Sequence, residues 1–114
     1  MSNVRAVLAR VVVPDLDAAL PLYQELAGVT EVRRFGFRDV ELAQVGPFLL
    51  LAGDTAPYTG RTATLLVESL APVLSALEAA GGEVVEGPSA APNGARLIAR
   101  HPDGATFEYI ETGP

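Results

Sequence analysis

Hydrophobic residues along this chain follow two spacings, one typical of strands and one typical of helices. Ala6–Val13 is a short run, rich in β-branched residues, that stops at Pro14 and therefore predicts a strand. Asp15 is a suitable cap for a helix that begins just after it. Within that helix, apolar residues recur three and four positions apart and predict one buried stripe, formed by Leu16, Ala19, Leu20, Tyr23 and Leu26.

Pro21 conflicts with this helix. Proline has no backbone N–H, and inside a regular helix it costs roughly 3 kcal/mol. Two arrangements remain open: either the first turn is irregular, or the regular helix starts near Leu20 and places Pro21 at its first position.

The remaining pattern predicts that the element order strand, helix and three strands occurs twice. In the first half, glycine-rich turns separate the strands Thr30–Phe35, Asp39–Gln44 and Phe48–Ala52. In the second half, Ser69 caps a helix with an apolar stripe, and the predicted strands are Thr62–Val67, Glu83–Glu86, Ala95–Arg100 and Ala105–Glu111. Such a repeat fixes the architecture.

We therefore expect an α+β fold made of two βαβββ modules. Their strands would form a curved, cup-shaped mixed β-sheet with the helices on its convex side. The chain is treated as a single domain spanning 1–114, with module 1 at about 4–53, a linker at about 54–61 and module 2 at about 62–112.

Composition narrows the possible functions. The 114 residues include no cysteine and one histidine, so disulfides, thiolate sites and sites built from several imidazoles are excluded. The net charge of −6 disfavours nucleic acid as a partner. No stretch reaches the ~18 apolar residues of a membrane span, and the N-terminus lacks the features of a signal peptide. A cytoplasmic protein with no membrane partner is expected.

Several motifs, in this order, resemble the vicinal oxygen chelate superfamily, which includes glyoxalases, bleomycin resistance proteins and extradiol dioxygenases. Val13–Leu20, followed by Tyr23, resembles the family's opening strand, turn and helix. Leu26–Val29 resembles its helix exit, and Pro102–Gly104 followed by Phe107–Glu108 resembles its closing hairpin and glutamate strand.

The resemblance implies four metal-ligand positions, which this chain does not fill. They fall on Leu8, Leu49, Thr62 and Glu108, and Glu108 is the one side chain among them that ligates a divalent metal well. We therefore expect no metal and no other cofactor.

A small-molecule site without a metal remains. Alternation along the strands places Leu8 with Arg10, and Thr62 with Thr64, on the faces that would line the cup. Aromatic rings and a further arginine flank it, so the expected ligand-binding residues are Leu8, Arg10, Phe37, Leu49, Tyr58, Thr62, Thr64, Arg96 and Glu108. Arg10 and Glu108 either pair with each other or bind opposite ends of a ligand. His101 is expected to be an exposed turn residue.

Two functions fit these residues. The first is a metal-free binding protein, similar to bleomycin resistance proteins, that holds an apolar or aromatic, antibiotic-like ligand. The alternative is a metal-dependent lyase, isomerase or dioxygenase of the same superfamily, with a degenerate site or a site shared between chains. Glu108 is the one candidate for a catalytic residue, and a homodimer is implied by the resemblance alone.

Overall fold

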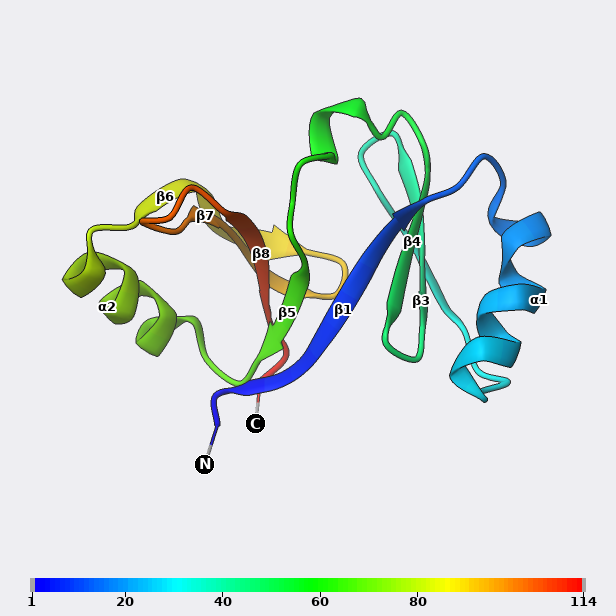
Figure 1. Cartoon of the computed structure of the whole chain (residues 1–114), viewed down its shortest axis with the longest axis horizontal. Helices are drawn as coiled ribbons and strands as arrows, with labels where there is room; N and C mark the ends of the chain where they lie inside the picture. The colour runs from blue at the N-terminus through cyan, green and yellow to red at the C-terminus, as the bar shows by residue number, and fades with distance from the viewer. Residues whose placement is uncertain (1, 114) are drawn as a thin grey trace. The chain divides into compact units, whose positions relative to one another are not determined.

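The computed structural model describes residues 2–113 and has an α+β architecture. It forms two compact units. The N-terminal unit comprises residues 8–59, and the C-terminal unit comprises residues 60–113 together with residues 2–7. Each unit carries one helix against one face of a mixed sheet (Figure 1).

The N-terminal unit contains a sheet in the order β2-β3-β4-β1. In it β1 runs parallel to β4, and the other neighbours are antiparallel. The elements are β1 (Val4–Val12, of which the part from Leu8 onward belongs to this unit), α1 (Leu16–Ala27), β2 (Arg33–Phe37), β3 (Val40–Val45) and β4 (Phe48–Gly53), followed by a short 3-10 turn at Ala56–Tyr58.

Helix α1 begins at Leu16 and continues through Pro21, so both arrangements expected for Pro21 are wrong. The Asp15 side chain accepts from the backbone of Asp17 at 3.0 Å, and Gly28 ends the helix in the left-handed region with φ 69°. Packing of the apolar stripe against the sheet offsets the cost of the proline.

One member of that stripe was also placed wrongly. Leu26 is 63% exposed, and Ala27 packs against the core in its place. The reason is geometric, because about eleven residues complete three helical turns, which returns Ala27 and not Leu26 to the side of Leu16.

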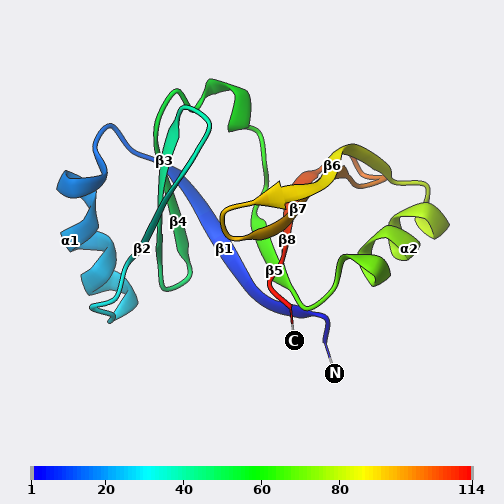
Figure 2. The same ribbon diagram turned by 180° about the vertical axis from the view of Figure 1, so that it is seen from behind.

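The C-terminal unit repeats the same topology, with the sheet order β5-β8-β7-β6 and β5 parallel to β8. Figure 2 shows its β6–β7 hairpin. The predicted repeat is therefore confirmed, and the elements are β5 (Thr64–Val67), α2 (Leu70–Ala80), β6 (Glu83–Ala91), β7 (Gly94–Arg100) and β8 (Thr106–Glu111).

Some strand limits differ from those expected. β2 starts at Arg33, and β5 starts at Thr64 and not at Thr62. The largest difference is β6, which continues to Ala91 through a segment expected to be a loop. Register shifts between Val84 and Ser89 let this strand absorb Gly87 and Pro88 as a bulge.

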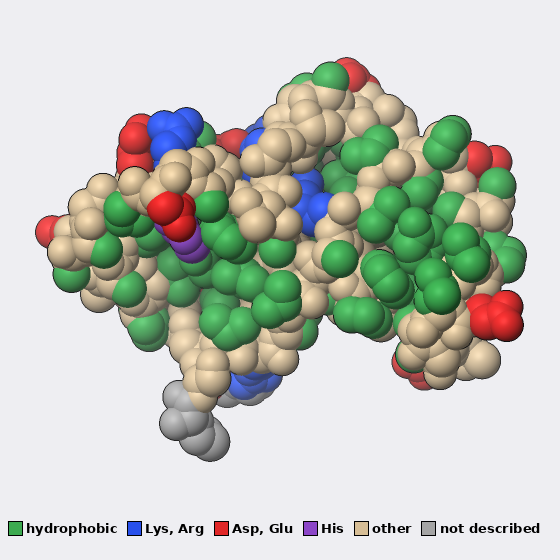
Figure 3. Space-filling view, viewed as in Figure 1, with side chains coloured by type: hydrophobic (Ala, Val, Ile, Leu, Met, Phe, Trp, Pro, Cys, Tyr) green, Lys and Arg blue, Asp and Glu red, His purple; other side chains and the backbone are tan. Residues whose placement is uncertain are grey.

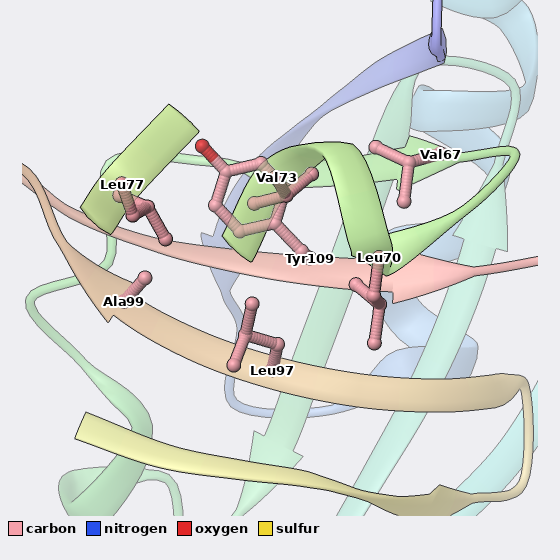
Figure 4. Close-up of a cluster of buried hydrophobic side chains, with 7 residues drawn as sticks. All are labelled: Val67, Leu70, Val73, Leu77, Leu97, Ala99 and Tyr109. Carbon is pink, nitrogen blue, oxygen red and sulfur yellow. The ribbon is translucent and has the colours of Figure 1, made fainter. Parts of the chain in front are cut away.

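Each helix covers its own core. In the C-terminal unit, the Tyr109 ring lies between α2 and the sheet, beside Val73 and Leu77 (Figure 4). The corresponding core under α1 includes Leu16, Ala43 and Leu50. Within residues 2–113, no helix has both the length and the hydrophobicity needed to cross a membrane.

Candidate functional site

Four strands of the C-terminal unit bring one row of side chains together. Ile98 on β7 lies opposite Glu86 on β6 and opposite Glu108 on β8. Glu108 in turn lies opposite Thr64 on β5. Partners in register share a face of the sheet, and Arg96 shares it as well because it lies two residues from Ile98. The face is the one opposite α2, since the alternate residues Tyr109 and Leu97 pack against the helix.

Thr64, Glu86, Arg96 and Glu108 form what we call the Arg96 cluster. Arg96 donates from Nε to Oε2 of Glu108 at 3.0 Å and from Nη1 to Oε1 of Glu86 at 2.8 Å. The Thr64 hydroxyl donates to the other oxygen of Glu108, Oε1, at 2.7 Å. The Arg96 side chain is 4% exposed and that of Glu108 is 12% exposed, so this charge pair lies largely out of water. Both carboxylate oxygens of Glu108 are therefore engaged by protein donors.

This arrangement does not suit a divalent metal. Of the four positions that the resemblance implies as ligands, Glu108 is the one carboxylate, and the guanidinium of Arg96 lies at hydrogen-bond distance from it. A hard cation needs several oxygen or nitrogen donors. Among residues 2–113, no three His, Cys, Asp or Glu side chains are grouped so as to hold a metal ion.

A second group of predicted site residues meets in the N-terminal unit. The rings of Phe37 and Tyr58 pack edge to face with their centroids 6.0 Å apart. The guanidinium of Arg38 lies 4.7 Å from the Phe37 ring centroid and 5.8 Å from that of Tyr58. Arg10 donates from Nη2 to the backbone carbonyl of Tyr58 at 2.9 Å. We call these four residues the Tyr58 cluster; cation–π contact and edge-to-face packing stabilise it.

The remaining predicted residues lie elsewhere. Leu8 and Leu49 are both 1% exposed, and Leu49 pairs in register with Arg10. Thr62 is exposed and precedes β5, although its backbone N–H donates to the carbonyl of Thr106. The pairing of Arg10 with Glu108 stays a prediction.

Two residues of these clusters have roles that the sequence did not indicate. Glu86 binds Arg96, because the β6 bulge keeps it in register with Ile98. Arg38 lies in the turn after β2, and its guanidinium lies on the aromatic pair. The sequence signal for the role of Arg38 was its position in a two-residue turn directly after Phe37.

His101 also differs from expectation, because it is half-buried and not an exposed turn residue. Its ring stacks on Phe107 with the centroids 4.3 Å apart, and Nε2 lies 2.7 Å from the Tyr109 hydroxyl. Burial raises the pKa of Tyr109 above its ordinary value. This pair lies on the helix side of the sheet, away from the Arg96 cluster.

Comparison with known proteins assigns the family. The family model described as the glyoxalase/bleomycin resistance protein/dioxygenase superfamily matches residues 5–109. The chain belongs to this superfamily. The resemblance read from the motifs is thereby confirmed, and so is the fold that it implied. No curated protein matches the sequence.

Solved structures with the same fold are found as well. A protein from Methanosarcina mazei, described as uncharacterized, is 38% identical with a TM-score of 0.89, and the match covers 96% of this chain and 94% of that one. Methylmalonyl-CoA epimerase from Mycobacterium tuberculosis is 21% identical, with a TM-score of 0.67 over 100% and 92% of the two chains. The epimerase from Streptomyces coelicolor in complex with 2-nitronate-propionyl-CoA is 16% identical, with a TM-score of 0.68 over 96% and 99%. The two epimerases share the fold.

Proposed function

We propose that this superfamily member is a metal-independent binding protein for a small, partly aromatic molecule. The observation that carries the proposal is the state of Glu108, whose two oxygens accept from Thr64 and from buried Arg96. A carboxylate held in this way acts as a fixed, charged part of a binding surface. Ligation of a metal would require it to exchange the guanidinium for the ion.

Each cluster offers its own chemistry to such a ligand. In the N-terminal unit, the Tyr58 cluster supplies two ring surfaces and two guanidinium groups. Aromatic rings provide large contact areas at low entropic cost, so this cluster favours a flat, antibiotic-like ring system. In the C-terminal unit, the carboxylates of the Arg96 cluster are rigid polar groups that favour a cationic group. The two clusters are therefore tested separately.

Binding in the presence of a chelator tests the proposal. Copper-free bleomycin and the planar cation ethidium are titrated against the EDTA-treated protein, with thermal stability and calorimetry as readouts. A ligand at 100 times its Kd stabilises the folded state by about 2.7 kcal/mol. We expect at least one probe to raise the Tm equally with and without EDTA. Failure of both probes to bind at millimolar concentration contradicts the proposal.

The aromatic contribution is tested with matched variants on one strand. Phe37 packs on Tyr58, whereas Phe35 lies two residues away on β2 and outside the Tyr58 cluster. Phe37→Leu is expected to weaken binding of the probe about tenfold, which corresponds to about 1.4 kcal/mol. Phe35→Leu is the control and is expected to change the affinity by less than twofold. Equal losses in the two variants would mean that the Phe37 ring does not contact the ligand.

Glu108 is tested by removing its charge while keeping its shape. Glu108→Gln is expected to weaken binding of a cationic probe about tenfold, and unchanged affinity would remove Glu108 from the site.

Elemental analysis of untreated protein distinguishes the metal-independent binding protein from a metal-dependent enzyme. A stoichiometric transition metal would contradict metal independence and favour a metal-dependent enzyme of the superfamily.

A further inference from the structure

The C-terminal unit contains a hollow on the opposite face of its sheet from the Arg96 cluster. Tyr109 and Leu65 line this hollow, whereas their strand neighbours Glu108 and Thr64 point to the other face. The pocket has a volume of about 360 Å³ and lies against one side of α2. It is therefore separate from the site of the proposed function.

The shape of the pocket follows from small residues on α2. Ala76 and Ala80 are one helical turn apart and line the hollow between Val73, Leu77 and the sheet. Larger side chains at these two positions would fill it. Hydrophobic side chains gather on the face formed by α2 and the strands beside it (Figure 3).

The lining has almost no charge. No Asp, Glu, Lys or Arg is among the described residues that form it, and most are aliphatic or proline: Val4, Leu65, Pro72, Val73, Ala76, Leu77, Ala80 and Pro102. Asn3 uses both ends of its amide on the backbone of Ser69, at 2.8 and 3.0 Å. A charged occupant would lose its hydration with no opposite charge to replace it, so the chemistry favours a neutral, largely apolar molecule.

The pair formed by His101 and Tyr109 adds one polar feature to this wall. If the tyrosine donates to Nε2, its oxygen remains available as an acceptor; if the histidine donates, the tyrosine O–H is available as a donor. A hydroxyl group on a ligand satisfies either arrangement, because it both donates and accepts. Burial raises the pKa of Tyr109, which keeps the phenol neutral across the physiological range.

We propose that this pocket, bounded by α2, Leu65 and the His101–Tyr109 pair, binds a neutral apolar molecule that carries a hydroxyl group. The volume lies within the range of small-molecule sites, and apolar lining with one convergent polar pair is their usual composition. Nothing in this proposal depends on the ligand or on the metal independence of the Arg96 cluster.

The test uses 2-naphthol as the probe and the full chain in ¹⁵N-labelled form. Amide shifts are expected at Leu65, Val73 and Tyr109 and should saturate with the probe concentration. Ala76→Trp fills the pocket and should weaken binding at least tenfold. Ala79→Trp is the control, because Ala79 is an exposed alanine of the same helix outside the lining.

The hydroxyl contact is tested by a second comparison. Tyr109→Phe should weaken 2-naphthol about fivefold, the effect of losing one neutral hydrogen bond, and leave the affinity for naphthalene unchanged. Equal affinities of the Ala76→Trp and Ala79→Trp variants would overturn the proposal, as would 2-naphthol shifts confined to other residues. A change of oligomeric state in Ala76→Trp, with no probe bound by the wild type, would identify a protein interface and also overturn it.

Discussion

Replacing Arg96 tests how the charged cluster of the C-terminal unit is stabilised. Arg96→Met keeps most of the aliphatic volume and removes the guanidinium. The side chain is 4% exposed and bonds to two carboxylates, so the loss removes a buried ion pair from Glu108, which is itself 12% exposed. We expect this variant to fold with lower stability.

The magnitude follows from the geometry. With charge centres about 4 Å apart and an effective dielectric constant near 20, the attraction to Glu108 is about 4 kcal/mol. Breaking one side of a buried pair costs about 3–5 kcal/mol in practice. The partial exposure of Glu86, 35% at its side chain, limits its share to below about 1 kcal/mol. We expect a loss near 3 kcal/mol, or about 12 °C in Tm for a chain of this size.

Urea denaturation followed by circular dichroism measures this loss. The matched control is Arg100→Met, since Arg100 lies on the same strand and face but its pair with Glu83 at 3.3 Å is exposed, and we expect less than about 0.5 kcal/mol there. The double variant Arg96→Met with Glu108→Gln should recover part of the loss, because no charge then stays buried without a partner. Equal losses at Arg96 and Arg100, or no recovery in the double variant, would refute the reasoning.

Three further predictions concern the framework. Burial raises the pKa of Tyr109, so as pH rises the phenol of the unfolded chain loses its proton before that of the folded chain. The free energy of unfolding should therefore fall above about pH 10. Urea denaturation at pH 9 and pH 11 should show a smaller fall in Tyr109→Phe than in the wild type. Gly94→Ala places a Cβ against the carbonyl oxygen of Glu111 at φ 135°, so a Tm lower by about 8 °C is expected from scanning calorimetry. Pro21→Ala restores an N–H that can donate to the carbonyl of Asp17. Calorimetry should then show a Tm higher by about 4 °C, and an unchanged Tm would mean that helix α1 accommodates Pro21 without loss of stability.

The sequence predicted the parts of this molecule that depend on periodicity. Alternation along β5 and β8 correctly placed Thr64 with Glu108 on one face and Tyr109 on the other. The duplicated element order predicted the topology of both units. The residue types at the positions that the resemblance implies as metal ligands could be read from the sequence, whereas metal independence stays a prediction.

The missed features depend on long-range geometry. A bulge in β6 brings Glu86 to Arg96, and register shifts of this kind leave little trace in a pattern of hydrophobic residues. The sequence did not indicate the burial of Arg96, because an arginine on a strand is usually solvated and its partners here come from two other strands. The stacking of His101 on Phe107 depends on the turn that closes the β7–β8 hairpin.

The bonds that Arg96 makes to two other strands also determine the order in which these residues can be replaced over time. A change at Arg96 alone removes the guanidinium from carboxylates on β6 and on β8 at once. A change at Glu86 alone leaves the bond between Arg96 and Glu108 in place. Substitution at Glu86 is therefore the easier first step, and relatives that lack the arginine are expected to lack Glu108 as well.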